Sequence, residues 1–369
     1  MKKLTLFIAT LSTLALASCA DSDEPGSAAT RQAIDDGIAF RSGLASRATE
    51  TTNANLSSFE VTAFAGNDIY FQDETFTKGS DSYFTSPKHF EWLDNNEKIK
   101  FYAYSPSIDQ LGGEIEQVAD TANLKLQDFM VADNIADQVD FITASATGNR
   151  KENQATGVEL TFDHRLSQVE IQAMSENPTY DIKAIGARIG RVEYMGTFDF
   201  ASASWTLDEW HDTAVYDTSC DTITLGATPQ SLMGPAGNAM LMPQTHYYWD
   251  PVGDPDNAAR QSYLSVLVQI TRKDNGYRVY PFPDDTKIDP ATGKLRDYAW
   301  ASIPLSVNWE QGKKYIYTLD FTLGGGNVDP DDPTPGDPVI SGDIKFKVTV
   351  DDWTSAPSSI PMTPIVKKS

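Results

Sequence analysis

Cys19 is the residue whose surroundings predict a defined chemical reaction. It follows Leu16-Ala17-Ser18, and small residues at the two positions before a cysteine are what the signal peptidase for lipoproteins requires. Met1-Lys2-Lys3 supplies a positive start, and the apolar stretch 4–17 is shorter than the roughly 20 residues that span a bilayer. We therefore expect residues 1–18 to be a signal peptide and the Cys19 thiol to be acylated, which holds the chain on a membrane. An ordinary signal peptide with a chance cysteine is the alternative.

Residues 19–37 are polar, small and acidic, as expected of a flexible tether between a membrane and the first folded domain. The run Ala20-Asp21-Ser22-Asp23-Glu24, directly after the cysteine, resembles the surface-export signal of bacteroidete lipoproteins. The sequence thus predicts an outer-membrane lipoprotein that is exposed on the cell surface.

The remaining polar residues form no catalytic or metal-binding pattern. None of the four histidines stands at metal-ligand spacing from a second ligand, and the chain has no Gly-x-Ser-x-Gly elbow and no phosphate-binding glycine loop. His164 lies between two expected strands and is interpreted as a hydrogen-bonded turn residue. The Asp-rich turns at 254–257 and 329–337 lack the spacing of a calcium loop and are interpreted as solvated turns. The sequence therefore predicts no enzyme, no metal site and no cofactor.

Cys220 is the second cysteine of the chain. With Cys19 acylated, no internal disulfide can form, so stability must come from apolar burial. Asp217 and Asp221 flank the Cys220 thiol, and nearby negative charge raises the pKa of a thiol, so that little of the nucleophilic thiolate is present. We interpret Cys220 as a small, partly buried strand or loop residue.

The charge balance excludes one class of partner. The chain has 29 Lys and Arg residues against 52 Asp and Glu residues, a formal charge of −23. Removal of residues 1–18 takes away Lys2 and Lys3, which changes this charge from −23 to −25. Such an acidic surface repels nucleic acid and anionic headgroups, so we expect no nucleic-acid partner.

A sugar-binding site needs exposed aromatic rings. The tryptophans are scattered, and most lie in or beside expected strands, where core or rim packing accounts for them. Trp205 and Trp210, with His211 in an acidic stretch, form the pair that could serve as an exposed platform. Glycan capture by a surface lipoprotein is therefore kept as an alternative function.

Three Asp-Thr-apolar tripeptides resemble the O-glycosylation sites of exported bacteroidete proteins. They place the candidate acceptor hydroxyls on Thr121, Thr213 and Thr222. Chance could also supply such tripeptides, so this modification is a hypothesis.

Short alternating segments between turns dominate the rest of the chain. Apolar residues at every second position place one face of a strand on a core, and β-branched and aromatic residues prevail in these segments. Because Gly, Pro, Asn and Asp turns separate them and hardly any helical periodicity occurs, we predict an all-β chain of antiparallel sandwiches, with one short helix or loop at 133–139. The expected strands are 59–64, 98–104, 157–162, 168–173, 263–270, 314–321 and 344–350.

The length and one internal break predict two domains. Removal of residues 1–18 from 369 leaves 351 residues, more than one hydrophobic core usually serves. Ser175-Glu176-Asn177-Pro178 is the best break, so we expect an N-terminal β-sandwich domain at 38–176 and a C-terminal one at 177–369. The Gly-, Pro- and Asp-rich segment 324–338 is expected to form no core and to lead the last strand either back into a sheet or out of it.

Motifs in a fixed order along the chain carry a family resemblance. They are the lipidation signal, Ile38 to Thr49, Lys100 to Pro106, Asp140 to Ala144, Leu160 to Val169, Ala239 to Gln244, Gly312 to Leu319 and the closing strand Ile344 to Trp353. Each motif alone is unspecific, but the ordered set covers nearly the whole mature chain. The sequence resembles the bacteroidete fimbrillins, which are fimbrial subunits exported as lipoproteins.

The resemblance implies two tandem transthyretin-like β-sandwich domains and assembly into a fimbrium by donor-strand exchange. In this family an arginine-specific protease cuts near the first strand, and loss of that strand opens a groove that a strand of a neighbouring subunit fills. Arg47 is the implied position of the cut, with Arg41 as the second choice, and a solvated loop residue is the alternative interpretation of Arg47. The removable strand is then the segment that contains Ile38, Phe40 and Leu44.

The resemblance also implies a donor strand near the C-terminus. Its alternating apolar residues are Ile344, Phe346, Val348 and Val350. The same strand could equally complete its own domain. Residues 360–366 are the rival donor, although two prolines reduce the number of ladder hydrogen bonds that this segment can make.

The leading prediction is a non-enzymatic fimbrial subunit, structural or adhesive, that enters a fimbrium after processing. Its expected partners are further copies of the chain or other fimbrial subunits, the outer membrane through the lipid on Cys19, and a host protein or glycan. A lipid-held anchor subunit that is never cut is the alternative within the same family.

Overall fold

The structure is a computed structural model whose described residues are 37–43, 51, 56–80, 83–208, 212–250, 261–331, 336–352 and 358–360. Strands dominate these residues and the helices are single turns, so the all-β prediction is confirmed. Each strand expected from alternation is present, and the short helix expected at 133–139 is the 3-10 turn Ile135–Asp137. No helix in the described ranges is long and apolar enough to cross a membrane.

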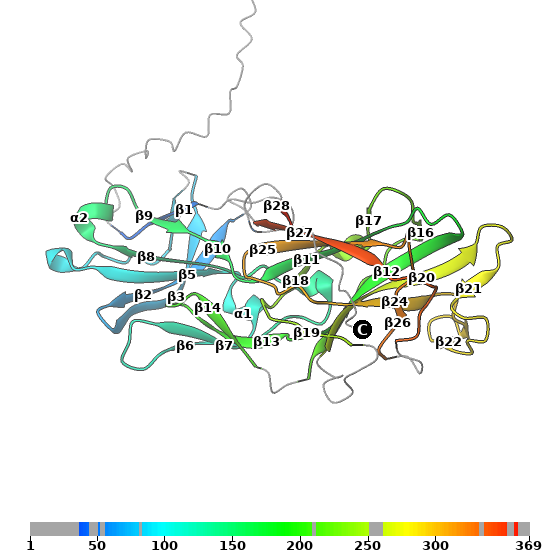
Figure 1. Cartoon of the computed structure of the whole chain (residues 1–369). Helices are drawn as coiled ribbons and strands as arrows, with labels where there is room; N and C mark the ends of the chain where they lie inside the picture. The colour runs from blue at the N-terminus through cyan, green and yellow to red at the C-terminus, as the bar shows by residue number, and fades with distance from the viewer. Residues whose placement is uncertain are drawn as a thin grey trace, which may run out of the picture.

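The molecule is elongated, with the strands of residues 58–78 toward one end, the strands of residues 278–289 at the other, and the last strands of the chain near the middle (Figure 1). The N-terminal sheet has the order β10-β8-β5-β2-β3-β4-β1-β9. A single residue, Phe162, separates β9 from β10, so the two ends of this order belong to one segment and the sheet closes on itself. The bounds are β1 Phe40–Gly43, β2 Ser58–Ala65, β3 Asp68–Lys78, β4 Phe84–Thr85, β5 Ile99–Ser105, β8 Ile142–Gly148, β9 Val158–Thr161 and β10 Asp163–His164.

Two sheets facing each other form the C-terminal half. One has the order β17-β11-β25-β27-β28, with β18 beside β11. The other has the order β15-β12-β20-β24-β26, with β16, β19 and β21 beside β12 or β20. The bounds of the first are β11 Ser167–Met174, β17 Gln230–Ser231, β18 Ala239–Leu241, β25 Lys313–Asp320, β27 Lys345–Asp352 and β28 Ser358–Ile360. Those of the second are β12 Tyr180–Val192, β15 Ala214–Asp217, β16 Ile223–Thr224, β19 Tyr247–Tyr248, β20 Gln261–Arg272, β21 Arg278–Tyr280, β24 Ala299–Pro304 and β26 Asn327–Val328.

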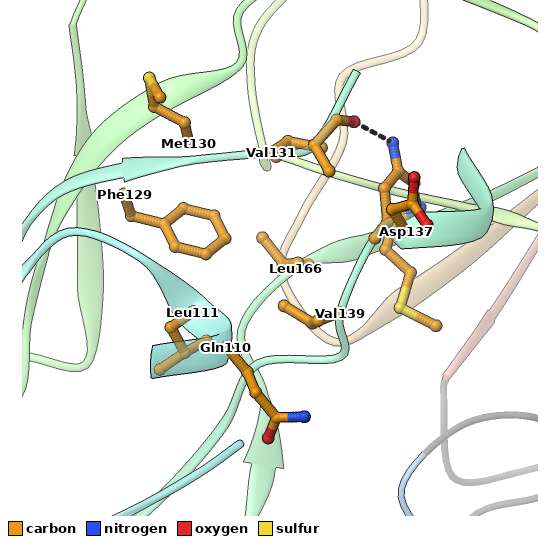
Figure 2. Close-up of a pocket in the computed structure, with 11 residues that line it drawn as sticks. Gln110, Leu111, Phe129, Met130, Val131, Asp137, Val139 and Leu166 are labelled. Atoms are coloured by element: carbon orange, nitrogen blue, oxygen red, sulfur yellow. Dashed lines mark hydrogen bonds between the residues drawn. The ribbon is translucent and has the colours of Figure 1, made fainter. Parts of the chain in front are cut away.

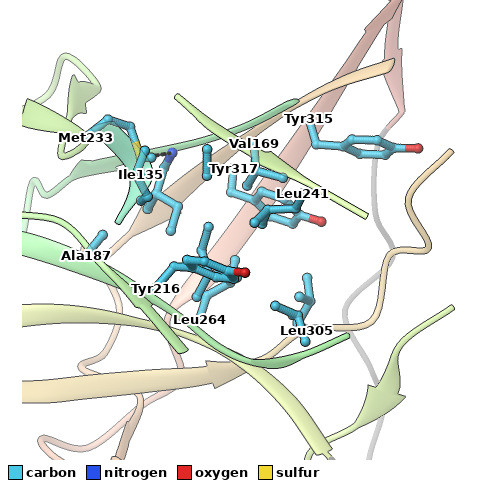
Figure 3. Close-up of a cluster of buried hydrophobic side chains, with 14 of the residues drawn as sticks. Ile135, Val169, Ala187, Tyr216, Met233, Leu241, Leu264, Leu305, Tyr315 and Tyr317 are labelled. Carbon is cyan, nitrogen blue, oxygen red and sulfur yellow. Dashed lines mark hydrogen bonds between the residues drawn. The ribbon is translucent and has the colours of Figure 1, made fainter. Parts of the chain in front are cut away.

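The core of this half lies between its two sheets. Val169 and Tyr317 project from one sheet and Ala187 and Leu264 from the other, and all four are buried (Figure 3). β11 pairs with β25 from Gln168↔Lys314 to Met174↔Asp320, so it belongs to the C-terminal half, whereas β10 belongs to the N-terminal sheet. The break at 175–178 expected from the sequence comes after β11.

A smaller sheet, β14-β13-β7-β6, joins the two halves. β7 (Leu124–Met130) comes from the first half of the chain and pairs antiparallel with β13 (Met195–Asp199) from the second. Its outer strands are β6 (Glu114–Gln117) and β14 (Ser204–Leu207). Leu126 and Phe198 are fully buried in the same cluster as the C-terminal core, so the two halves share packed side chains.

The Gly-, Pro- and Asp-rich segment folds against the C-terminal half. Val328 in β26 is buried and belongs to the core cluster, so the expectation that residues 324–338 form no core is wrong. The physical reason is close backbone packing, because a Cβ on Gly324 would lie 2.0 Å from the carbonyl carbon of Gly342. Buried Asp329 also pairs with Arg188 of β12 at 3.5 Å. The segment thus returns the last strand to its own sheet.

Candidate functional site

Phe40 of β1 occupies the middle of the N-terminal core. Its side chain is fully buried, and its ring packs edge-on against Phe76 at a centroid distance of 4.8 Å and against Phe101 at 5.1 Å. Phe59 lies 6.1 Å away in a similar orientation. Edge-to-face pairs of this kind add about 0.5–1.5 kcal/mol each to the stability that burial provides. We call the space that β1 fills between β4 and β9 the first-strand slot.

The backbone of β1 makes only a short set of ladder hydrogen bonds, whereas its apolar Phe40 side chain is fully packed in the core. It pairs parallel with β9 from Phe40↔Val158 to Gly43↔Thr161 and meets β4 at Phe40↔Phe84. The amide of Ile38 donates to the carbonyl of Phe90 at 2.9 Å. Parallel ladders are slightly less stable per residue than antiparallel ones, and this one is short. Apolar burial therefore contributes most to the retention of β1.

Arg41 lies within β1 and fits its surroundings imperfectly. Its guanidinium approaches Glu159 of β9 at 3.8 Å, and its side chain is 32% exposed while that of Glu159 is 72% exposed. The Nε atom of Arg41 is buried and has no hydrogen-bond partner within the described residues. Leu44 and Arg47, the other residues expected here, lie outside the described residues, as does Cys19.

β27, the expected donor strand, pairs antiparallel with β25 along its length, from Lys313↔Asp352 to Asp320↔Lys345. Ile344 and Val348 are buried, and Phe346 and Val350 are half-buried. Their neighbours Lys345 and Lys347 are exposed, so the alternation predicted from the sequence corresponds to two faces of the strand. In the intact chain this strand completes its own sheet, and β28 pairs with its outer edge.

Trp205 packs against the core and also borders a groove. The indole lies 5.1 Å from the rings of Phe129 and Phe198, and its Nε1 donates to the carbonyl of Arg165 at 2.6 Å. Trp205 also lines a groove of about 520 Å³ together with exposed Tyr247 and with Trp309, Glu310 and Gln311. Trp210 and His211, the other residues of the expected platform, lie outside the described residues.

A second cavity near α1 (Ile108–Leu111) is too small for a substrate. It measures about 40 Å³ and is lined by Leu111, Phe129, Val131 and Leu166, among others (Figure 2). Pockets that hold a small-molecule ligand usually measure about 300–1,000 Å³, so this cavity falls well below that size.

The histidines with side chains in the interior serve packing and hydrogen bonding. His164, expected in a turn, forms part of β10, and its Nδ1 lies 2.8 Å from the buried carboxylate of Asp140. His246 is enclosed against Trp309, and burial lowers its pKa to about 3, so it is uncharged. No group of three or more His, Cys, Asp or Glu side chains within the described residues is arranged to hold a metal ion.

The remaining candidate residues lie on or near the surface. Burial, and then the charge of Asp221, raises the pKa of the half-buried Cys220 thiol. Thr121 and Thr222 are exposed and Thr213 is half-buried. The hydroxyl of Thr121 donates to the carbonyl of Val118 at 2.7 Å.

Sequence reasoning identified β1 but missed the residues that surround it. Phe76 and Phe84 belong to segments with weaker alternation than the predicted strands, and Glu159 was not singled out within the expected strand 157–162. The signal that could have found Glu159 is its charge opposite to Arg41, combined with a pairing partner that only the fold reveals.

Comparisons with known proteins agree with this architecture. A profile of the family described as Fimbrillin-like matches residues 46–353. A search of the curated proteins found no match. A fimbrial protein from Bacteroides vulgatus has a similar structure, with a TM-score of 0.55 and 15% sequence identity over 86% of this chain and 99% of that chain.

Weaker structural similarity extends to two other proteins. A proposed cell adhesion protein from Bacteroides ovatus gives a TM-score of 0.47 at 14% identity, over 87% of this chain and 98% of that chain. The fimbrial anchor protein Mfa2 from Porphyromonas gingivalis gives 0.33 at 12% identity, over 86% and 97%.

The family profile covers most of the chain and spans the strands from β2 to β27, whereas β1 and β28 lie outside the matched residues. Members of this family are non-enzymatic structural or adhesion proteins. The chain belongs to the fimbrillin-like family and is a non-enzymatic fimbrial or cell adhesion protein of the cell surface.

Proposed function

We propose that this chain is a fimbrial subunit that is exported as a lipoprotein through Cys19 and assembled by donor-strand exchange. Its two halves correspond to tandem transthyretin-like domains, with residues 19–37 as the tether from the outer membrane to the first of them. The observation that carries the proposal is the first-strand slot. A short strand near the N-terminus, with Phe40 at the centre of the core, leaves a deep apolar groove when it is removed.

Arg47 is the better position for the maturing cut. Arg41 lies inside β1, half-buried and opposite Glu159, so a protease would have to open the strand before it could cut there. A cut after Arg47 falls beyond the end of β1 at Gly43 and before β2 begins at Ser58. It therefore releases β1 whole, together with the tether and the lipid.

β27 is the proposed donor, and the groove it enters belongs to a second copy or to another fimbrial subunit. Its alternating Ile344, Phe346, Val348 and Val350 offer an apolar face, each side chain contributing roughly 1.5–3 kcal/mol when fully buried. Donation requires β27 to leave β25, so assembly replaces one complete ladder by another. Residues 360–366 are the rival donor.

Limited cleavage of the purified chain tests the proposal. A chain cut after Arg47 is expected to form polymers that appear as ladders in unboiled SDS gels, with Ala48 as the new N-terminal residue. Arg47→Ala should stay uncut and monomeric, and Arg41→Ala should behave like the unaltered chain. A chain that is cut after Arg47 and stays monomeric contradicts the assembly role.

An uncut anchor is the second candidate. With β1 in place the N-terminal sheet closes on itself, so the first-strand slot of the unprocessed chain is filled. Such a subunit can end a fimbrium but cannot accept a donor. N-terminal sequencing and mass spectrometry of the protein from surface preparations distinguish the two roles, because an anchor retains acylated Cys19.

Glycan binding rests on the groove beside Trp205. Half-exposed Trp205 and exposed Tyr247 offer aromatic faces, and Glu310 and Gln311 lie beside them. A glycan array with the unaltered chain, the Tyr247→Ala variant and a Tyr248→Ala control outside the groove tests this candidate. Absence of signal with the unaltered chain removes it.

A further inference from the structure

Two segments at opposite ends of the chain share a residue pattern. Residues 38–44 read Ile-Ala-Phe-Arg-Ser-Gly-Leu, and residues 344–350 read Ile-Lys-Phe-Lys-Val-Thr-Val. Isoleucine and phenylalanine coincide at the first and third positions, a basic residue stands at the fourth, and a branched apolar residue stands at the seventh. The first segment contains β1 and the second contains most of β27.

The shared positions have corresponding places in the two strands. Ile38 and Phe40 point into the N-terminal core and are buried. Ile344 is likewise buried, whereas Phe346 is half-buried in its own sheet. The following basic residues, Arg41 and Lys347, both lie on the other face of their strands.

Resting on the donor-strand function above, we propose that β27 of a second copy enters the first-strand slot in the direction and register of β1. Phe346 then takes the place of Phe40 between Phe76 and Phe101. Lys347 takes the place of Arg41 opposite Glu159. The new ladder with β9 is parallel, like the one it replaces.

The physical fit of the donor improves at two positions. Phe346 moves from a half-buried site to one where the native phenyl ring is fully enclosed, so it gains apolar burial. A lysine in place of Arg41 keeps the positive charge near Glu159 and has no counterpart of the buried Nε atom that lacks a partner within the described residues.

One position of the donor fits less well, and it predicts a variant that should assemble faster than the unaltered chain. Lys345 takes the place of Ala39, whose side chain is fully buried. The lysine stem must therefore run out along the edge of the slot to keep its ammonium in water. Shortening this side chain should therefore help the donor to enter the slot. If Lys345 were fully solvated in the polymer instead, Lys345→Ala would not change the rate of assembly.

Disulfide trapping tests the register directly. The experiment uses the full chain with Cys220→Ser, cut after Arg47 so that Cys19 is absent, and with Glu159→Cys and Lys347→Cys in the same chain. The proposed register pairs these two residues directly across strands, within the range of Cα distances that a disulfide spans. Polymerisation under mild oxidation should give a ladder that survives boiling and collapses on reduction.

The matched controls shift the donor cysteine by two residues. Lys345→Cys and Thr349→Cys, each with Glu159→Cys, keep the side chain on the same face but move it by about 6.6 Å along the strand. They should form polymers in unboiled gels without the covalent ladder. A boiling-resistant ladder from either shifted pair would overturn the proposed register. Polymers in which none of the three β27 cysteines forms a disulfide with Glu159→Cys would overturn it as well.

The kinetics of assembly give a second readout. Lys345→Ala should polymerise faster than the unaltered chain. Lys347→Glu should slow assembly by about two- to five-fold, the scale of an exposed ion pair, and Glu159→Lys should restore the rate in that variant. No change with Lys347→Glu, or slower assembly with Lys345→Ala, overturns the proposal. Failure of every variant, and of the unaltered cut chain, to polymerise instead rejects donor-strand exchange itself.

Discussion

Phe40 and Arg41 are neighbours in the chain but fit their surroundings unequally. The ring of Phe40 is enclosed by Phe76 and Phe101, whereas the guanidinium of Arg41 makes a partly solvated pair with Glu159 at 3.8 Å. Exposed pairs of this kind contribute about 0–1 kcal/mol, and salt weakens them further. Retention of β1 should therefore depend on apolar burial and change little with ionic strength.

Phe40→Ala is expected to lower the free energy of unfolding of the uncut chain by about 3–5 kcal/mol, because it removes a fully buried ring from an aromatic cluster. Urea denaturation followed by tryptophan fluorescence measures this change. Phe346→Ala, at a half-buried site, is the matched control and should cost less. Equal losses for the two variants would contradict the central place of Phe40.

His246 gives the molecule a dependence on pH. Burial lowers its pKa in the folded chain to about 3, whereas an unfolded histidine titrates near 6.5. The unfolded state then binds a proton that the folded state does not, so the stability contribution of this residue falls as pH drops from about 6.5 toward 3. Relative to His246→Gln, the unaltered chain should lose up to about 1.4 kcal/mol per pH unit in that window.

Urea denaturation at several pH values, taken as the difference between the two chains, isolates His246 from the carboxylates. His89→Gln, at an exposed position, is the control. A difference that stays constant with pH would show that protonation of His246 is not linked to folding.

At the scale of elements, the strand positions could be predicted from sequence, but their partners could not. Alternation at 157–162 and 168–173 reports local burial, and β9 and β11 form there. The local sequence pattern does not indicate that β9 pairs parallel with β1, or β11 with β25, because these partners lie far apart in the chain. The slot was therefore predicted in outline, from β1, while its walls required the fold.

The first-strand slot should accept a strand as a free peptide. A chain cut after Arg47 and freed of β1 by mild denaturant is expected to have a lower melting temperature than the uncut chain. A synthetic peptide of residues 344–352 should raise it again with increasing dose, since ligands that bind only the folded state stabilise it. The same peptide with Phe346→Ala is the control. An equal effect of both peptides would show that the slot does not select the phenyl ring.

At the scale of the whole molecule, the sheet that contains β7 and β13 makes the two halves interdependent. Phe198 of β13 packs 5.2 Å from Phe141 and from Phe200, and all three are buried. The sequence analysis expected two separate sandwiches and did not include this shared sheet. A strand pairing between the halves leaves no trace in the local alternation of apolar residues. We expect the halves to unfold together.

Phe198→Ala is expected to reduce amide protection in both halves, because it opens the packing that they share. Hydrogen exchange with mass spectrometry should show faster exchange in β5 and in β20. Phe59→Ala, buried in the N-terminal cluster, is the matched control and should act mainly on β5. Exchange confined to one half in the Phe198 variant would contradict a single cooperative unit.

The pairing of β7 with β13 has a mechanical consequence for a filament of such subunits. The chain passes between the halves at the β10–β11 junction, and this small sheet adds a second crossing beside it. A body joined at two places resists bending and twisting in a way that a single tether does not. In the proposed assembly, tension along a fimbrium in flowing liquid would thus be borne by both crossings within each subunit, and the exchanged strand would be the compliant joint between one subunit and the next.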